Sequence, residues 1–304
     1  MNFFLRCFNA FKHPRASLFN HIRGARWTHL LSDKTYLRII YYLRVNKILH
    51  FKNPKSFNEK LQWLKVYNRD PLYTILVDKL KSKKWVANKI GQEHIIPFLG
   101  VYDKWEDIDF SILPDQFVIK CTHNCGVVIC TDKNKLDINK AKATIEKSLH
   151  ENYYYFSREW PYKNVPPKIL IEKYMVDESG TELKDYKFFC FNGEPKLFFI
   201  ATDRNINDVK FDFFDMDFNH LPIRNGHDNA SHLITKPEKF DEMIEIARTL
   251  SKDMPHVRVD LYNINGTIYF GEMTFFHFGG MTPFEPEKWD YEIGSWLELP
   301  KKRK

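Results

Sequence analysis

The stretch VRVDLYNINGTIYFGEMTFF, residues 257–276, alternates apolar with polar residues on both sides of an Asn265-Gly266 pair. Such alternation predicts two β-strands that each bury one face. The Asn-Gly pair predicts a tight turn between them, because both residues tolerate the positive φ that such a turn requires. The stretch is therefore expected to form an amphipathic β-hairpin.

The polar face of this predicted hairpin carries one cation and two carboxylates. With a period of two residues, Arg258 and Asp260 lie on one face of the first strand, and Glu272 and Thr274 share a face of the second. Two carboxylates suit Mg²⁺, which binds one or two of them and leaves room for substrate phosphates. A half-exposed sheet face, on which Arg258 forms a surface ion pair with Asp260 or Glu272, fits the pattern equally well.

The composition is that of a folded protein. The chain has 304 residues, of which 43% are hydrophobic and 16% aromatic, enough for a substantial core and two or three subdomains. It has no run of 18 apolar residues, and its start lacks the features of a secretory signal, so neither a transmembrane helix nor a signal is expected. An odd number of cysteines without CxxC spacing indicates reduced thiols in a cytoplasmic protein. They are Cys7, Cys121, Cys125, Cys130 and Cys190.

Positive charge is concentrated in the N-terminal part of the chain. Residues 1–66 hold 13 Lys and Arg against Asp33 and Glu59, a net charge of +11, whereas the other residues hold 33 basic against 37 acidic ones, a net charge of −4. Apolar stretches with interleaved basic residues predict helices here. This basic helical segment fits peripheral association with an anionic membrane, docking on an acidic partner, or an ordinary solvated face. No nucleic acid is expected as a partner, because no recognised binding motif accompanies the charge.

The rest of the chain mixes helical and strand-like segments. Two short helices are predicted within residues 35–66, where Ser56 and Glu59 form a capping box. Further predicted helices cover residues 71–90, 138–151 and 236–253, of which 236–253 is expected to be the last. The predicted strands, besides the hairpin, are 95–102, the strand–turn–strand 115–132, 168–175, 185–191, 196–203 and 208–218. Helices interspersed with hairpins predict an α+β fold rather than a doubly wound sheet.

Two lysines outside the hairpin are candidate phosphate ligands. Lys120 ends the strand FVIK just before the turn CTHNCG, whose backbone N–H groups can approach phosphate oxygens. Lys79 lies on the predicted helix 71–90. Each signal is weak alone, because the turn has a single glycine, Gly126, and many buried strands end in lysine.

The order of these pieces is more specific than any one of them. A helix with the pair DK precedes a strand with lysine and a turn, then a strand ending in EKYM, and finally the pattern RVDxxxxxGxxxxxExT. This order resembles the ATP-grasp superfamily. The phrases WLKVYNRDPLYTILVDK, LKDYKFFCFNGEPK, VRVDLYNINGTIYFGEMTF and PEKWDY look like its TupA-like branch, which is found in surface-polysaccharide gene clusters. The likeness covers about residues 55–295.

The resemblance implies an ATP-grasp fold, in which two α+β subdomains grip ATP. Residues 67–175 would form the first subdomain with the lid, and residues 176–304 the second with the metal-binding hairpin. Residues 1–66 would be a basic, mainly helical segment that precedes both. Lys79 and Lys120 match the two lysines that hold the α- and β-phosphates of ATP.

Other positions match further ATP contacts of the superfamily. The loop 122–127, with His123 and Gly126 as implied contacts, matches the lid loop but is poorer in glycine and serine than such loops usually are. The remaining implied contacts are Glu172, Lys173 and Met175 at the adenine hinge and Asp185 at the ribose hydroxyls. Lys187 and Arg204 are candidates for γ-phosphate contacts, although no motif assigns them.

The hairpin matches the catalytic and metal-binding part of the superfamily. Arg258 matches the phosphate-binding arginine, and Arg258 and Lys120 are the implied catalytic residues. Asp260 and Glu272 match the metal-binding carboxylates. Thr274 stands where the superfamily most often has asparagine, so a hydroxyl replaces the amide oxygen as the third implied Mg²⁺ ligand.

The resemblance implies a carboxylate–amine ligase that uses ATP and Mg²⁺. ATP-grasp enzymes mostly activate a carboxylate as an acyl phosphate and pass the acyl group to an amine, while metal ions neutralise charge on the phosphates. The TupA-like branch implies an amide formed on a uronic acid or similar carboxylate of a surface polysaccharide or its precursor. The implied setting is the cytoplasm, at the inner face of the cell membrane.

Other interpretations of the sequence stay open. The DMD at Asp215–Asp217 resembles the DxD metal motif of glycosyltransferases, and an inactive ATP-binding scaffold is the non-enzymatic alternative. The three cysteines between residues 121 and 130, with His123 nearby, are residue types of a zinc site, although a strand–turn–strand would place them on differing faces. His277 fits either a substrate contact or a packing role.

Overall fold

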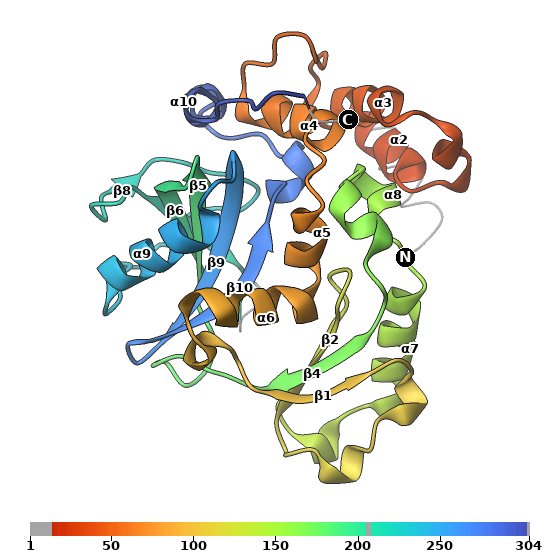
Figure 1. The fold of residues 1–304 in the computed structure, drawn as a ribbon, viewed down its shortest axis with the longest axis vertical. Helices are drawn as coiled ribbons and strands as arrows, with labels where there is room; N and C mark the ends of the chain where they lie inside the picture. Colours follow the sequence, from red (N-terminus) through yellow and green to blue (C-terminus); the bar gives the residue numbers. More distant parts are fainter. Residues whose placement is uncertain (1–13, 205–207, 303–304) are drawn as a thin grey trace.

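The computed structural model of the protein describes residues 14–204 and 208–302. They form two antiparallel sheets with helices around them (Figure 1), which confirms the predicted α+β class. The small sheet has the order β1-β4-β2-β3, and the large sheet has the order β10-β9-β5-β6-β7-β8. The strands of the small sheet are β1 (Phe98–Tyr102), β2 (Phe117–Cys121), β3 (Val127–Cys130) and β4 (Ile169–Lys173). Those of the large sheet are β5 (Asp185–Phe191), β6 (Glu194–Thr202), β7 (Lys210–Phe214), β8 (His220–Leu221), β9 (His256–Ile264) and β10 (Thr267–Thr274).

The helices lie at both ends of the molecule and between the sheets (Figure 1). The α-helices are α2 (Pro14–Ile22), α3 (Asp33–Val45), α4 (Phe57–Tyr67), α5 (Leu72–Val77), α6 (Lys79–Ile90), α7 (Ile138–Leu149), α8 (Tyr154–Ser157), α9 (Phe240–Ser251) and α10 (Lys288–Trp296). The short 3-10 helices are η1 (Arg26–Leu30), η2 (Gln92–His94), η3 (Trp105–Asp107), η4 (Phe110–Ile112), η5 (Lys133–Lys135), η6 (Trp160–Asn164) and η8 (His277–Gly280). No helix within the described ranges is both long and apolar enough to cross a membrane.

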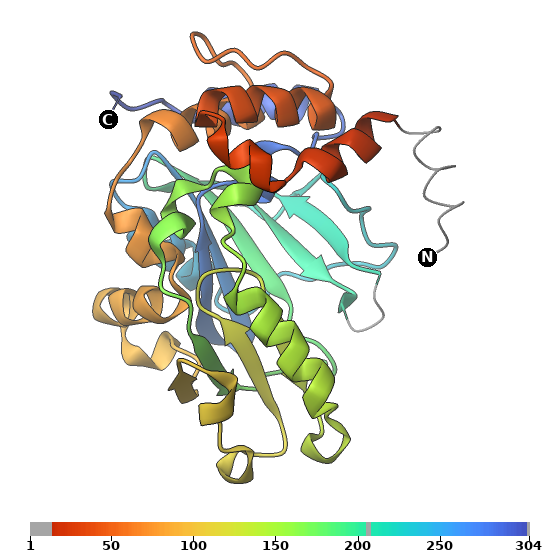
Figure 2. The same ribbon diagram turned by 90° about the vertical axis from the view of Figure 1, so that its right-hand side faces the viewer.

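Each sheet is built around its own hydrophobic core. In the small sheet, Phe117 and Ile119 of β2 and Ile171 of β4 pack with Ile145 of α7 and are fully buried. Figure 2 shows α7 running beside this sheet, away from the N-terminal helices. The large sheet packs against α9, and its core also takes in Tyr36 of α3. The N-terminal helices are therefore packed into the core of the large sheet.

Two local sequence signals are confirmed by the backbone. The hydroxyl of Ser56 accepts from the Glu59 N–H (3.3 Å), and the Glu59 carboxylate accepts from the Ser56 N–H (3.1 Å), so the capping box begins α4. Asn265 and Gly266 have φ of 51° and 77°, which closes the hairpin between β9 and β10 as expected. The capping box and the turn each depend on interactions within a few residues, so both form largely independently of the rest of the fold.

Two helix predictions are wrong. The single helix predicted for residues 71–90 is interrupted at Asp78, because the Asp78 carboxylate accepts from the N–H groups of Leu80 and Lys81 and caps a new helix, α6. The helix near residue 250 is not the last one either, since α10 follows the hairpin and packs on α4. The break at Asp78 matters for the site, because it makes Lys79 the first residue of α6.

Candidate active site

The polar residues of the hairpin are brought together by the strand register. A β-bulge just before Glu272 places Glu272 opposite Asp260 and Thr274 opposite Arg258. On the other side of β9, Lys187 of β5 stands opposite Asp260. Residues directly opposite each other share a face of the sheet, so all five side chains lie on one face.

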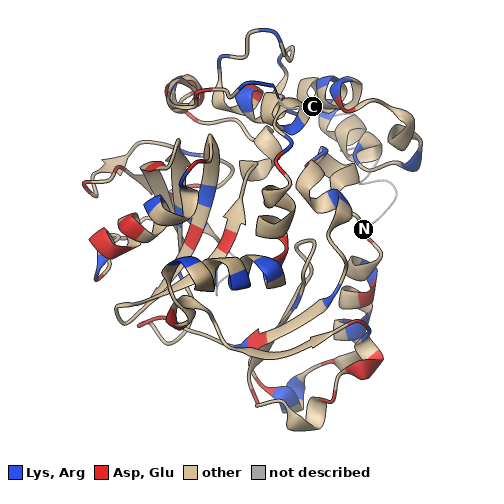
Figure 3. Ribbon diagram, viewed as in Figure 1, with Lys and Arg blue, Asp and Glu red and all other residues tan. Residues whose placement is uncertain are grey.

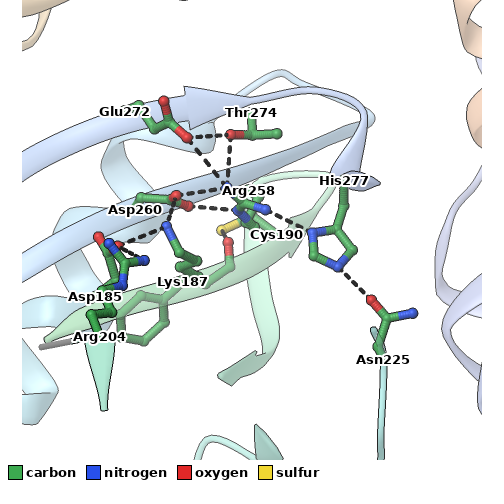
Figure 4. Close-up of polar contacts among 11 residues, drawn as sticks. Asp185, Lys187, Cys190, Arg204, Asn225, Arg258, Asp260, Glu272, Thr274 and His277 are labelled. Atoms are coloured by element: carbon green, nitrogen blue, oxygen red, sulfur yellow. Dashed lines mark hydrogen bonds and ion pairs between the residues drawn. The ribbon is translucent and has the colours of Figure 1, made fainter. Parts of the chain in front are cut away.

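Arg258 and Asp260 form a buried, two-pronged ion pair in the middle of this face. Nε of Arg258 lies 2.7 Å from Oδ1 of Asp260, and Nη2 lies 2.7 Å from Oδ2. The ammonium of Lys187 pairs with the same Oδ2 (Figure 4). Both members of the Arg258–Asp260 pair are buried. The alternative of a surface pair between Arg258 and Asp260 is therefore wrong, because the strands β5 and β10 enclose it.

His277 fixes the other end of the Arg258 guanidinium. Nη1 of Arg258 donates to Nδ1 of His277 at 2.6 Å, and Nε2 of His277 lies 2.8 Å from Oδ1 of Asn225. The Asn225 amide nitrogen donates to the carbonyls of Thr282 and Pro283, so its oxygen is left to accept from Nε2. Burial and the charge of Arg258 lower the pKa of His277 well below its usual value. His277 is thus a neutral acceptor that orients Arg258. Of the two roles that fit the sequence, the structure shows the packing role and not a substrate contact.

Glu272 differs from Asp260 in being open to the cavity. Its side chain is 44% exposed, and only Oε1 is engaged within the described residues, by the Thr274 hydroxyl (3.2 Å) and more weakly by Arg258 (3.4 Å). Desolvation raises the pKa of Glu272, but the charges of Lys79, Lys187 and Arg258 outweigh it and lower the pKa to about 2. Glu272 is therefore an ionised carboxylate whose second oxygen is free to bind a ligand.

A cavity of about 450 Å³ lies in front of this face, between the large sheet, α6 and the loop after β2. Six cations and three carboxylates line the cavity, and this excess of positive charge favours a polyanionic ligand. The cations are Lys79, Lys83, Lys120, Lys187, Arg204 and Arg258, and the carboxylates are Glu159, Asp185 and Glu272. Figure 3 shows that α6, which carries several basic residues, runs past strands β9 and β10, which carry acidic residues, and α6 contacts β10 directly.

Lys120 reaches the cavity from β2 with the help of a buried carboxylate. Its ammonium lies 2.7 Å from Oε2 of Glu172 on the neighbouring strand β4, and Lys83 of α6 lies 2.9 Å from Oε1. Glu172 is only 1% exposed. Burial raises its pKa, but Lys83 and Lys120 outweigh that effect and lower the pKa to about 2. Glu172 does not line the cavity; it holds two of the lysines that do.

The predicted lid loop is tied to its surroundings by backbone contacts. Lys79 donates its ammonium to the carbonyl of Asn124 (2.6 Å), and its N–H to the carbonyl of Thr122 (3.0 Å). Asn124 in turn accepts from the N–H of Gly126 and donates to the carbonyl of Ser148 at the end of α7. Gly126 lines the cavity, so this loop forms one of its walls.

Besides Glu172, three sequence-predicted ATP contacts are not at the cavity wall. The His123 side chain is buried beneath the loop, with Nε2 near the carbonyls of Ser148 (3.1 Å) and Glu151 (3.2 Å). Lys173 is exposed at the end of β4, and Met175 is half-buried just beyond it. The adenine hinge at these last two residues stays a prediction.

Asp185 and Arg204 stand at the far end of the polar face. Asp185 is buried, and its Oδ2 lies 3.3 Å from the ammonium of Lys187 and pairs also with Arg204 (Figure 4). Burial raises the pKa of Asp185, but Lys187 and Arg204 bring it below its usual value. Its Oδ1 is buried and has no hydrogen-bond partner within the described residues. Contact with ribose stays a prediction.

Two alternative metal motifs find no support in the fold. Cys121 and Cys130 are buried and Cys125 is exposed, and the described part of the chain has no group of three or more His, Cys, Asp or Glu that could hold a metal ion. A zinc site at the cysteines is therefore wrong. In the DMD motif, Asp215 accepts from the N–H groups of Asp217 and Asn219 and closes the turn after β7, away from the cavity lining.

A family model described as TupA-like ATPgrasp matches residues 59–298, which is most of the chain. The chain belongs to the TupA-like ATP-grasp family. This confirms the resemblance to the ATP-grasp superfamily.

Solved structures with similarity to this ATP-grasp chain are distant from it in sequence. D-alanine–D-alanine ligase from Bacillus anthracis, in complex with ATP, is 19% identical over 66% of this chain and 54% of its own, with a TM-score of 0.39. The Helicobacter pylori enzyme is 12% identical over 82% and 70%, with a TM-score of 0.43. An L-amino acid ligase from Bacillus licheniformis is 13% identical over 81% and 56%, with a TM-score of 0.46. The chain thus spans 54% of the first of these ligases. Comparison with curated proteins gives no significant match.

Several residues of the ATP-grasp cavity were not found from the sequence. Lys83 follows Lys79 by four residues on α6, and that spacing on one helix face was an available signal. Tyr262 continues the alternation of Arg258 and Asp260 along β9 and also lines the cavity. Other lining residues between 153 and 162 lie in a segment without a motif or a regular period, so only the fold reveals them.

Proposed function

We propose that this ATP-grasp protein is an ATP-dependent carboxylate–amine ligase that acts through an acyl phosphate. The observation that carries the proposal is the Arg258 guanidinium, buried and held between Asp260 and His277 beside the free carboxylate oxygen of Glu272. A cation that is rigidly held in place is suited to a carboxylate that becomes a tetrahedral oxyanion. The excess of positive charge around it suits a nucleotide triphosphate.

The lysines of α6 and of strand β2 are assigned to the phosphates. Lys120 and Lys83 are held by Glu172, and Lys79 stands at the start of α6. Charge-assisted hydrogen bonds from such lysines would position the phosphates for in-line attack by the substrate carboxylate. Lys187 and Arg204 are placed by Asp185 at the other end of the cavity, where they suit the γ-phosphate.

The donor set fits Mg²⁺ in its chemistry. Glu272 offers an ionised carboxylate with one oxygen free of protein partners, and Asp260 and Thr274 stand beside it on the same sheet face. These three residues would hold the ion together with phosphate oxygens. When bound, the ion would neutralise charge on the β- and γ-phosphates. Asp260 already accepts from Arg258 and Lys187, so Glu272 is the principal ligand in this proposal.

The proposed substrate is a uronic acid or similar carboxylate of a surface polysaccharide or its precursor, joined to an amine. This part rests on the family context, by analogy. The cavity is consistent with it, because its walls are polar and carry both cations and hydroxyl groups. The division into residues 1–66, 67–175 and 176–304 stays a prediction.

ATP consumption with defined substrates tests this function. Purified protein is incubated with MgATP and a panel of uronic acids and amines, and ADP and amide products are measured. ADP release that needs both acid and amine, and an amide of the expected mass, support the ligase. The variant Arg258→Met should lose the amide product while staying folded. Product formation from a sugar nucleotide without ATP would replace the proposal with a glycosyltransferase, and absence of MgATP binding in calorimetry would remove its basis.

We also propose that the protein works at the inner face of the cell membrane. Among the described residues of the basic N-terminal segment, Leu30 is 92% exposed, and Trp27 and Ile48 are more than half exposed. Apolar side chains among basic ones suit an anionic lipid surface, where each basic residue contributes on the order of 1 kcal/mol. Residues 1–13, which belong to the same predicted segment, lie outside the described residues.

Vesicle flotation tests this location. Full-length protein should float with anionic vesicles at low salt, less so at high salt, and not with neutral vesicles. A variant with Trp27, Leu30 and Ile48 each changed to Ser should float less, with unchanged ATP binding. If the wild-type protein ignores anionic vesicles at low salt, the charge belongs to a solvated or partner-binding face instead.

A further inference from the structure

A second group of cavity-lining residues comes from segments that carry no ATP motif. Tyr153 precedes α8, and Glu159 and Tyr162 lie at the start and in the middle of η6. Phe276 and Gly279 come from the end of the hairpin and from η8. This wall is aromatic and carries a single carboxylate, unlike the lysine-rich wall formed by α6 and β2.

Glu159 is a buried carboxylate with an incomplete set of partners. It is 3% exposed, and its Oε1 accepts from the hydroxyl of Ser157 at 2.7 Å. That is its single hydrogen bond within the described residues, and no described cation lies within ion-pair distance of it. A carboxylate buried in this way is costly unless another group completes its hydrogen bonds.

The nearest buried cation cannot serve as that group. Lys65 of α4 is fully buried, and its ammonium donates to the Gln62 side-chain oxygen (3.1 Å) and to the carbonyls of Ser157 (2.9 Å) and Gly279 (2.7 Å). An ammonium has three N–H donors, so all of them are used. Lys65 therefore offsets part of the charge of Glu159 through space, and Glu159, which lines the cavity, keeps Ser157 as its single hydrogen-bond donor within the described residues.

The aromatic neighbours of Glu159 favour a cationic ligand over an anionic one. Tyr153 and Tyr162 pack edge to face with ring centroids 5.2 Å apart, and Phe276 lines the same cavity. Aromatic faces attract an organic cation, and a buried carboxylate attracts it more strongly. A carboxylate or phosphate would be repelled by Glu159, so the wall discriminates against the ligands that suit the lysines.

We propose that this wall binds the amine substrate of the ligase as its ammonium, with Glu159 accepting an N–H bond and then a proton from it. The inference rests on the proposed function and names the place of its second substrate. The ammonium loses one proton to Glu159, and the free amine attacks the acyl-phosphate carbonyl. The C–N bond forms, the C–O bond to phosphate breaks, and phosphate leaves with the electron pair. Phosphate takes the second amine proton, and Glu159 later releases the first to water.

Binding of a probe ammonium tests the site without knowledge of the natural amine. The protein is titrated with n-butylammonium chloride at constant ionic strength, with sodium butyrate and 1-butanol as matched controls, and the melting temperature is followed. We expect a saturable rise with the ammonium and none with the controls. Glu159→Gln should weaken the response about tenfold or more, since a charge-assisted hydrogen bond is lost. The exposed Glu298→Gln should leave it unchanged.

A second pair of variants covers the case in which Glu159→Gln does not fold. Tyr162→Phe keeps the ring and should retain the ammonium response, whereas Tyr162→Leu should weaken it. A wild-type protein without any saturable response, or a folded Glu159→Gln with the full response, overturns the amine site. Calorimetry with MgATP is run on the same samples, and Glu159→Gln should bind within about twofold of wild type. Failure of the wild type to bind MgATP would count against the ligase and not against the ammonium site, so the two failures are distinguishable.

Discussion

Glu172 in the small sheet and Glu272 in the large sheet have the same low pKa for different structural reasons. In both residues the pKa is lowered to about 2 by nearby cations. Glu172 is 1% exposed and has a lysine directly on each of its oxygens, at 2.9 and 2.7 Å. Glu272 is 44% exposed, and the cations that lower its pKa leave one oxygen without a partner.

The difference shows that a perturbed carboxylate pKa alone does not identify a ligand-binding group. The Glu172 carboxylate is closed to a ligand, because a lysine lies on each of its two oxygens. The Glu272 cluster is open, because its cations offset the charge of Glu272 without bonding to its second carboxylate oxygen. A ligand can still bind that oxygen. We therefore expect substitutions at Glu172 to affect stability, and substitutions at Glu272 to affect turnover.

The largest expected effect is on the stability of Glu172→Gln. The change leaves Lys83 buried without a counter-charge, and removing one partner of such a pair costs about 3–5 kcal/mol of unfolding free energy. Urea denaturation measures it. The double variant Glu172→Gln with Lys83→Met should recover most of the loss, because no buried charge is left unpaired. Equal instability in the double variant would mean that the cluster is not a closed charge pair.

Acid sensitivity is the next effect in size. The pKa of Glu172 lies below its unfolded value, so its contribution to stability is present above about pH 4.5 and is lost as the pH falls toward 2. Protonation should remove about 3 kcal/mol over that window. Urea denaturation at about pH 3 and 6 should show most of this loss in the wild type and in the exposed-site control Glu298→Gln, but less of it in Glu172→Gln. The same acid sensitivity in all three proteins would show that other carboxylates control it.

Glu272→Gln should lower turnover by about a hundredfold or more and leave folding nearly unchanged. The substitution keeps the size of the side chain but removes a charge that faces the proposed divalent ion, which supplies several kcal/mol of charge stabilisation. Thermal stability should change little, because the Glu272 side chain is 44% exposed and solvent screens its interactions with the nearby charges. ATP consumption and melting temperature are the measurements.

Two substitutions at the neighbouring Thr274 serve as graded controls for Glu272→Gln. Thr274→Asn should retain activity, since it restores the oxygen ligand that related enzymes use more often. Thr274→Val removes the hydroxyl at similar volume, so its activity should fall between those of Thr274→Asn and Glu272→Gln. Near-wild-type turnover in Glu272→Gln would mean that the hairpin carries only an ion pair.

Lys120→Ala should have the smallest of these effects, because Lys120 belongs to both the closed cluster and the cavity. Loss of one charge-assisted phosphate contact should weaken MgATP binding by about 1.5–3 kcal/mol. Stability should change less than in Glu172→Gln, because Glu172 keeps Lys83. Lys81→Ala, which changes an exposed lysine of α6, is the control and should bind MgATP as the wild type does. Equal affinity in Lys120→Ala would take Lys120 out of the phosphate site.

The hairpin shows how far a sequence pattern predicts a site. The Asn265-Gly266 turn and the alternation along both strands correctly place Arg258 and Glu272 on one polar face. The pattern does not distinguish a surface pair from a buried one. Burial depends on β5 lying beside β9, a pairing between residues some 70 positions apart in the chain.

The residues around Glu159 show the opposite case. The segment from Tyr153 to Tyr162 has no periodicity or motif, and its two 3-10 or single-turn helices bury no regular face. The Glu159 carboxylate lacks a cationic hydrogen-bond donor because the ammonium of Lys65, which is far away in sequence, donates all of its hydrogen bonds to other acceptors. Such a relation between three separate segments has no local signal.

The sequence by itself determined the α+β class, the hairpin, the capping box at Ser56 and the family to which the chain belongs, because these depend on side-chain period, turn chemistry and motif order within short stretches. Only the tertiary structure decided which charges are paired and which stay open to a ligand. The pKa and the partners of Glu172, Glu272 and Glu159 depend on burial and on cations from other elements. Electrostatic interactions are set by distance and desolvation in space, and neither quantity can be read along the chain.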